Sequence, residues 1–153
     1  MISIVLFIIT FFFMEFVAWF THKYVMHGFL WNLHEDHHKP DHRSFFEKND
    51  AFFLIFAIPG MSLIALGSIF SVPYTLPIGL GITAYGFCYF LVHDVFIHQR
   101  FKWLRNSNNI YFRALRRAHK VHHKHLGKEE GECFGMLVVP WKYFKNEIEH
   151  QKA

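Results

Sequence analysis

Cysteine is scarce in this chain, which has only two among 153 residues. Cys88 lies inside an apolar run and Cys133 in a polar segment, so we expect no disulfide between them and a reducing compartment. Two thiols are also too few to hold an iron–sulfur cluster. Neither a glycine-rich dinucleotide fingerprint nor a haem-attachment motif is present. The sequence therefore encodes no redox cofactor other than metal ions held by other side chains.

Charge is also sparse, at 18% of the chain, and basic residues are confined to two regions. All sixteen lysines and arginines lie within residues 23–48 or 100–152. The chain start has neither a basic region nor a small-x-small cleavage site, so we expect an uncleaved first helix rather than a secretory signal. By the positive-inside rule, both basic regions are predicted to be cytoplasmic and the N-terminus outside. A nucleic-acid partner is not expected.

Apolar residues, in contrast, make up 52% of the sequence and aromatic residues 20%. Three nearly uncharged runs, at residues 2–20, 51–70 and 72–92, are each about 20 residues long, enough for a helix to cross a ~30 Å hydrocarbon core. The connection at residues 71–73 is short, which predicts a tight antiparallel hairpin. We therefore predict an all-α, multi-pass helical bundle of about three spans in the inner membrane.

The remaining segments, residues 21–50 and 93–153, are predicted to form a cytoplasmic helical cap, so that residues 1–153 make a single membrane domain. All thirteen histidines fall in this cap, ten of them in four clusters of alternating pattern. Ten imidazoles exceed what one metal ion can coordinate, which predicts a two-metal centre. Three crossings place all four clusters on the same side of the membrane. The predicted ligands are His22, His27, His34, His37, His38, His93, His98, His119, His122 and His123.

The spacing within the clusters has geometric consequences. Histidines at i, i+3 and i+4 share a helix face, so the triplets beginning at His34 and His119 can each point at a common centre. The pairs beginning at His22 and His93 are offset by five residues, about 140° around an ideal helix. Either the two members of a pair serve different metals, or the helix ends or bulges between them.

Two acidic residues are candidates for a supporting role. Glu15, within the first span, is costly in lipid and should face the interior, as the partner of a histidine or at a substrate tunnel. Asp94 directly follows a patterned histidine and could orient its ring or ligate a metal. In contrast, His42, His125 and His150 lie outside the repeated pattern and are not expected to touch metal.

The region of the last triplet also carries a basic stripe, which falls on a different helix face from the histidines. Such a face is typical of contact with anionic lipid headgroups or with an acidic protein partner, and the two uses are compatible. The stripe consists of Arg113, Arg116, Arg117, Lys120 and Lys124.

A site with many imidazoles and few carboxylates suits iron, zinc or copper. Zinc would indicate hydrolysis, whereas a centre facing lipid favours oxidation of an apolar substrate by two irons and dioxygen. The residues thus predict a di-iron membrane oxygenase, hydroxylase or desaturase that receives electrons from a soluble donor. A histidine-rich membrane metal carrier is the competing hypothesis, but carriers place ligands inside their spans and the predicted spans contain no histidine.

Four segments resemble the bacterial beta-carotene 3-hydroxylase family most clearly, in a match that extends over nearly the whole chain. The first two are MHGFLWNLHEDHHKPDHRSFFEKND (26–50) and LVHDVFIHQR (91–100). The others are YFRALRRAHKVHHK (111–124) and GECFGMLVVP (131–140). The chain departs from the family in this last region, at Val138, Val139 and Trp141, which bears on the preference among carotenoids.

The resemblance implies hydroxylation at C3 of each beta-ionone ring, turning beta-carotene into beta-cryptoxanthin and then zeaxanthin. It also implies two non-haem irons on the ten patterned histidines, dioxygen as co-substrate and reduced ferredoxin as electron donor. The alternative is another lipid oxidase with similar histidine clusters, such as a carotenoid ketolase or a sterol or fatty-acid hydroxylase or desaturase.

Overall fold

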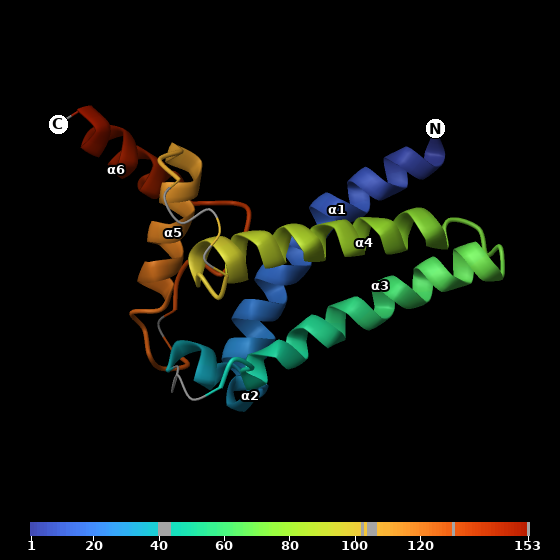
Figure 1. Ribbon diagram of the computed structural model, residues 1–153, viewed down its shortest axis with the longest axis horizontal. Coiled ribbons are helices and arrows are strands. Elements are labelled where there is room, and N and C mark those ends of the chain that lie inside the picture. Colours follow the sequence, from blue (N-terminus) through green and yellow to red (C-terminus); the bar gives the residue numbers. More distant parts are fainter. Residues whose placement is uncertain (40–43, 102, 104–106, 130, 153) are drawn as a thin grey trace.

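The computed structural model describes residues 1–39, 44–101, 103, 107–129 and 131–152, and within these ranges the chain is helical with no strand. The elements follow one another along the chain, and those labelled α can be followed in Figure 1. In order they are α1 (Ile2–Phe20), the π-helical η1 (Thr21–Phe29), α2 (Trp31–His38), the 3-10 turn η2 (Lys48–Asp50), α3 (Ala51–Ile69), α4 (Thr75–Phe90), the π-helical η3 (Leu91–Ile97), α5 (Ile110–His122) and α6 (Trp141–Lys152). The predicted all-α class is confirmed.

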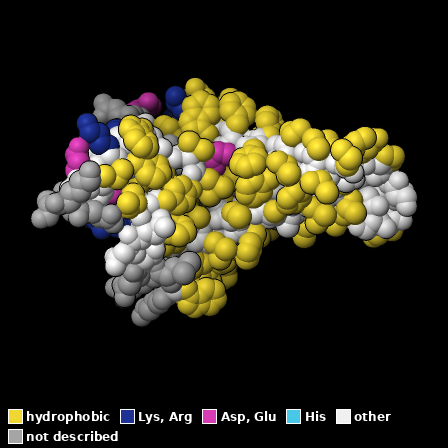
Figure 2. Space-filling model, turned by 90° about the horizontal axis from the view of Figure 1, so that it is seen from above, with side chains coloured by type: hydrophobic (Ala, Val, Ile, Leu, Met, Phe, Trp, Pro, Cys, Tyr) yellow, Lys and Arg dark blue, Asp and Glu magenta, His cyan; other side chains and the backbone are white. Residues whose placement is uncertain are grey.

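Three of the helical stretches are long and apolar enough to cross a membrane. They run over Ile2–Phe29, Lys48–Ile69 and Thr75–Ile97, of 28, 22 and 23 residues. Only 11 to 22% of their apolar windows is buried inside the protein, so most of this surface is free to meet lipid. Figure 2 shows the same division, with apolar side chains along the elongated body and most of the charged ones gathered at one end. The prediction of three spans is confirmed.

Helix α4 lies between the other two spans and contacts both, while α3 returns alongside it as a hairpin (Figure 1). Glycine permits these close approaches. A Cβ added at Gly79 would lie 2.7 Å from the Gly60 carbonyl oxygen of α3, and one added at Gly81 would lie 2.9 Å from the Phe7 carbonyl oxygen of α1. Small residues therefore set the packing of the bundle, as is common between membrane helices.

The third helix begins three residues later than the predicted span, at Thr75 rather than Val72. The residues between α3 and α4 form the hairpin turn instead. Ser71 and Tyr74 adopt positive φ angles of 52° and 66°, a conformation incompatible with a continuing right-handed helix. The predicted span includes residues 72–74 because Val72 and Pro73 are apolar, whereas Ser71 already belongs to the predicted turn.

The cap packs α5 and α6 against the end of the bundle. Asn109 begins α5 by accepting hydrogen bonds from the backbone N–H groups of Tyr111 and Phe112. The buried face of α5, which includes Leu115 and Ala118, then packs in one apolar cluster with the buried Tyr143 of α6. This packing brings α5 beside η3 and carries its histidines toward those of the other segments.

The predicted basic stripe on α5 is only partly a free surface. Arg113 and Arg117 form ion pairs of 2.7 and 2.9 Å with Glu147 of α6. Arg116 stacks over the ring of Phe96, with its guanidinium 4.2 Å from the ring centroid. These three arginines hold α5 against its neighbours, and of the five predicted residues Lys120 and Lys124 are the exposed ones.

Candidate metal centre

The five-residue offset of the histidine pairs is resolved by the backbone. His22 and His27 lie on the π-helical η1, and His93 lies on the π-helical η3, which His98 directly follows. In these segments hydrogen bonds run from i+5 to i, as in the 2.9 Å bond from the His98 amide to the His93 carbonyl. This wider turn brings residues five apart onto the same side of the helix. Of the two alternatives left by the sequence, the bulged helix is therefore the one that forms.

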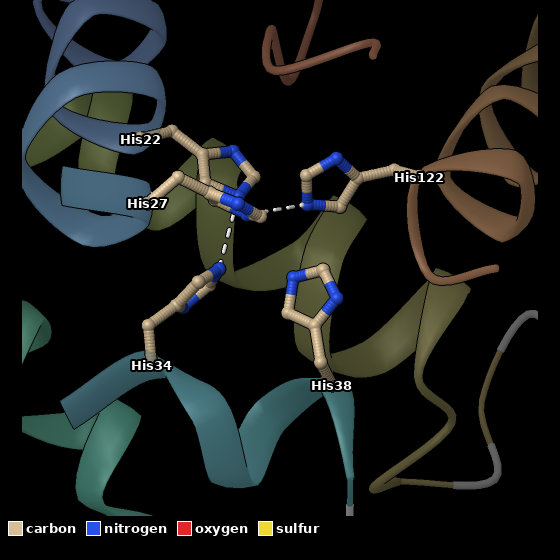
Figure 3. A group of neighbouring side chains, drawn as sticks. All are labelled: His22, His27, His34, His38 and His122. Carbon is tan, nitrogen blue, oxygen red and sulfur yellow. Dashed lines mark hydrogen bonds between the residues drawn. The ribbon is translucent and has the colours of Figure 1, made fainter. Parts of the chain in front are cut away.

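Five histidines from three elements converge in one cluster, which we call group 1. Ligand nitrogens of these residues all lie within 4.8 Å of one another, and all five side chains are buried. Figure 3 shows the rings from η1, α2 and α5 pointing into a common space. Group 1 consists of His22, His27, His34, His38 and His122.

Four more histidines form group 2, again with ligand nitrogens within 4.8 Å of one another: His37, His93, His98 and His119. His123 belongs to neither group by this measure. Its ring stacks on His38 at 4.5 Å between centroids, and its Nε2 lies 2.8 Å from the Nε2 of His119. The tenth patterned histidine thus lies between the two groups.

The two triplets do not each serve one centre, as their spacing suggested. His34 and His38 of α2 join group 1 whereas His37 joins group 2, and on α5 His122 joins group 1 whereas His119 joins group 2. The reason is that adjacent positions on a helix point about 100° apart, so a triplet spans enough of the circumference to reach two neighbouring centres. Each of these helices therefore contributes to both groups.

The group 1 rings are oriented from outside by oxygen atoms. The Nδ1 atoms of His22, His27, His38 and His122 donate to backbone carbonyl oxygens at 2.8–3.1 Å. His34 Nδ1 donates to the Asn49 side-chain oxygen at 2.7 Å. Because a carbonyl oxygen only accepts, Nδ1 carries the proton, and a neutral ring then has its lone pair on Nε2.

Those Nε2 atoms face one another at the centre of group 1. The His22–His34 and His27–His122 separations are 3.2 and 3.3 Å (Figure 3), and His38 Nε2 is buried with no hydrogen-bond partner among the described residues. Two lone pairs at this distance repel unless a cation lies between them. Ligand nitrogens about 2.1 Å from one ion would be separated by roughly 3.0–3.4 Å. The donor set therefore fits a metal ion.

Group 2 differs because carboxylates orient its rings. Glu47 accepts from His37 Nδ1 at 2.8 Å, and Asp94 lies 3.3 Å from His93 Nδ1. Arg100 links both carboxylates, at 3.3 Å from Glu47 and 3.2 Å from Asp94. The Nε2 atoms of His37 and His93 again face each other, at 3.0 Å. With both rings neutral, a metal ion between these atoms would relieve their repulsion, as in group 1.

The other candidates lie apart from the rings. Glu15 has no hydrogen bond to a histidine among the described residues, and instead accepts from backbone amides of residues 136–138 and from Tyr85. The His125 side chain joins neither group, although its carbonyl accepts from His38. His42 and the side chain of His150 lie outside the described residues. The sequence reasoning did not assign roles to Glu47, Asn49 or Arg100, which become visible only once the cap is folded.

Burial keeps the cap histidines in the metal-binding, neutral form. Desolvation lowers the pKa of His34 to about 3 and that of His38 to about 4. Desolvation, together with the repulsion of neighbouring histidines, lowers the pKa of His122 to about 2 and that of His123 to about 3. The pKa values of His37 and His119 are held well below 6.5 by the same two causes.

These shifts predict loss of metal and of stability in acid. Below pH 6.5 the unfolded chain binds protons that the folded chain excludes, so the free energy of unfolding falls by about 1.4 kcal/mol per pH unit for each such histidine. The loss should begin near pH 6.5 and continue toward pH 3–4. We expect the denaturation temperature in detergent and the amount of bound metal, measured by elemental analysis, to be constant above pH 7. Both should fall steeply below about pH 6. Unchanged values at pH 5 would contradict the buried, neutral cluster.

The sequence matches the fatty acid hydroxylase family over residues 7–146. The chain belongs to this family. Among curated relatives, beta-carotene hydroxylase of Pantoea ananas is 42% identical over 127 residues, covering 83% of this chain and 71% of the relative. The enzyme of the same name from Pseudescherichia vulneris is 43% identical over 128 residues, covering 82% of this chain and 70% of the relative. Beta-carotene 3-hydroxylase 2 of Arabidopsis thaliana is 38% identical over 130 residues, covering 83% of this chain and 42% of the relative. No solved structure matches.

Membership of the fatty acid hydroxylase family gives the histidine groups a chemical meaning. The family is one of di-iron enzymes, and the relatives named above are oxidoreductases. This chain is accordingly a membrane-bound oxidoreductase with a histidine-rich metal site. The resemblance noted from the sequence is confirmed over most of the chain.

Proposed function

We propose that this protein is a beta-carotene 3-hydroxylase. It would hydroxylate C3 of both beta-ionone rings, converting beta-carotene to beta-cryptoxanthin and then to zeaxanthin. The observation that carries the proposal is the 42–43% identity to two bacterial beta-carotene hydroxylases over most of the chain, with all four histidine clusters brought together. Each round consumes one dioxygen, two electrons and two protons and yields one hydroxyl group and one water.

The proposed metal ligands are the ten patterned histidines, holding two non-haem irons. Group 1 and group 2 each offer enough imidazoles for one ion, and His123 would complete group 2 or bridge the two groups. An iron pair would supply the activation of dioxygen that hydroxylation of an unactivated C–H bond requires. The protein would hold the rings neutral by burial and fix their orientation through the acceptors at Nδ1.

The substrate would reach the site from the bilayer. The histidine pairs lie on η1 and η3, where the first and third membrane helices continue toward the cap. Beta-carotene is a rigid rod about as long as a bilayer is thick, so its terminal rings rest near the membrane surface. Because the hydrocarbon offers no polar handle, apolar packing would select the ring position.

The proposed topology places the cap in the cytoplasm and the N-terminus outside, with residues 1–153 acting as one hydroxylase domain in the inner membrane. Supporting this, the described basic side chains lie in the cap or at the span ends next to it, as the positive-inside rule requires for a cytoplasmic face. Reduced ferredoxin, or a similar acidic donor, would bring the electrons. Lys120 and Lys124 are exposed and could contact this donor or anionic lipid headgroups. The three arginines of the stripe contact other parts of the protein instead.

Expression of this chain in cells that accumulate beta-carotene should produce beta-cryptoxanthin and zeaxanthin, measured by pigment chromatography. We also expect cryptoxanthin to accumulate when enzyme is limiting, because the second ring must turn over or rebind after the first round. The His122→Ala chain, at matched expression, is the control and should leave beta-carotene unchanged.

Other outcomes of this experiment favour the alternatives. Keto-carotenoids would indicate a ketolase. Unchanged beta-carotene with confirmed expression would move the search to sterols and acyl lipids. A metal carrier would leave oxygen consumption of the membranes at the level of the control, whereas a hydroxylase raises it.

A further inference from the structure

Glu15 is an acidic residue in the middle of an apolar membrane helix, and it is fully engaged by hydrogen-bond donors. Its Oε1 accepts from the backbone amides of Met136, Leu137 and Val138 at 2.9–3.0 Å. Its Oε2 accepts from the hydroxyl of Tyr85 at 2.6 Å and also from the Leu137 amide at 3.0 Å. Both carboxyl oxygens are therefore paired with donors, which offsets the cost of placing an acidic side chain at this depth.

The backbone that Glu15 holds is the tail segment, Gly131–Pro140, more than 100 residues away in the sequence. The chain approaches the carboxylate closely at Gly135. A Cβ added there would lie 3.1 Å from Glu15 Oε1 and 3.2 Å from the Val138 carbonyl oxygen, tighter than ordinary van der Waals contact. The tail segment therefore packs tightly against the carboxylate at Gly135, in addition to binding it through hydrogen bonds.

The same tail segment orients two rings of group 1. The Phe134 carbonyl accepts from His22 Nδ1 at 3.0 Å, and the Glu132 carbonyl accepts from His122 Nδ1 at 2.8 Å. These carbonyls lie two and four residues before Met136, the first of the amides that Glu15 binds. If the segment moved away from α1, both rings would lose the acceptor that fixes their orientation and tautomer.

We propose that Glu15 is a positioning residue, which holds the tail segment against the membrane helix and thereby fixes His22 and His122 for metal binding. The proposal rests on the metal centre described under the proposed function, but on no particular substrate. It assigns to an acidic side chain within the span a structural task at the metal centre, with the tail backbone as the connection.

Cys133 provides a built-in reporter of tail docking. It lies beside Phe134, its thiol is half-buried, and it donates to the Tyr143 hydroxyl at 3.4 Å. In a Cys88→Ser background it is the single cysteine, so its rate of reaction with a maleimide measures how often the tail segment opens. Bound iron is measured on the same purified samples by elemental analysis.

Glu15→Leu should raise the labelling rate of Cys133 by at least about tenfold and reduce bound iron to about half, because group 1 loses its orientation while group 2 keeps its own. Glu15→Gln should rescue both readouts to within about threefold of the background, since its amide oxygen can still accept from the three backbone amides. Phe16→Leu, on the exposed neighbouring position, is the matched control and should change neither readout.

A second pair of variants separates tail docking from helix packing. Tyr85→Phe removes only the donor from α4, so labelling should stay near the background. Gly135→Ala crowds the carboxylate from the tail side and should raise the labelling rate of Cys133. If Glu15→Leu fails to accumulate in the membrane, this variant alone tests whether contact with Glu15 holds the tail segment. Labelling within about twofold of the background in both Glu15→Leu and Gly135→Ala, or acceleration by Tyr85→Phe equal to that by Glu15→Leu, would overturn the proposal. Neither readout involves carotenoid, so a failed product assay would leave this result unaffected.

Discussion

Replacing either His119 or His122 with alanine should reduce product formation by about 100-fold or more, since each substitution removes a buried ring from a different group. His122 belongs to group 1 and His119 to group 2. Each variant should therefore lose about one of the two proposed irons while keeping most of the other. Iron per chain by elemental analysis and pigment chromatography of the same preparations measure the two effects.

The matched control is His125→Ala, which removes a histidine three positions beyond His122 and six beyond His119. Its side chain lies outside both groups, and the backbone carbonyl that accepts from His38 remains in the variant. We expect wild-type iron and activity. If His119→Ala also retained full iron content and activity, the shared two-metal centre would be wrong.

Arg100→Met should lower activity and iron affinity by about 10- to 100-fold, the range typical of residues that orient metal ligands. The Arg100 guanidinium lies 2.8 Å from Asp50, 3.2 Å from Asp94 and 3.3 Å from Glu47. Without it, three neighbouring carboxylates repel one another, and two of them no longer hold the imidazoles of group 2 in place. The effect should therefore fall on the iron of group 2, which can be followed by titration of the metal-free protein with iron(II).

Arg100→Lys is expected to be intermediate, because a single ammonium keeps the charge but cannot reach all three carboxylates with the geometry of a guanidinium. Lys39→Met serves as the control for loss of a basic residue in the cap. Lys39 pairs with Glu35 in an exposed ion pair at 2.9 Å, and such pairs contribute little. An Arg100→Met protein that bound two irons with unchanged affinity would show that the carboxylates orient the rings unaided.

The contrast between the groups explains why these two predictions differ. Rings of group 1 donate to neutral carbonyl or amide oxygens, whereas His37 and His93 of group 2 face carboxylates. Loss of a neutral acceptor leaves one ring free to rotate. Loss of Arg100 instead leaves the carboxylates of a partly buried network without their positive partner. Several side chains of the network should therefore shift together.

The sequence by itself determined the membrane class and which histidines would be candidates for a metal site. Long uncharged runs must be helical in lipid because the backbone has no other hydrogen-bond partner there. Two predicted spans separate the first two histidine clusters from the last two. An even number of crossings returns the chain to the same side of the membrane, so all four clusters can meet there. Chain connectivity and hydropathy were sufficient for this result.

Only the tertiary structure decided how the histidines are shared and what holds them. The triplets divide between two groups because neighbouring elements supply rings from different directions, which no spacing on one helix records. The pairs meet through π-helical turns, and Arg113 and Arg117 turn inward because Glu147 lies opposite them. Glu15 finds backbone amides rather than a histidine, since its partners come from the far end of the chain. Each of these arrangements depends on contacts between segments that are distant in the sequence. A local sequence pattern does not record which distant backbone group will lie within hydrogen-bond distance.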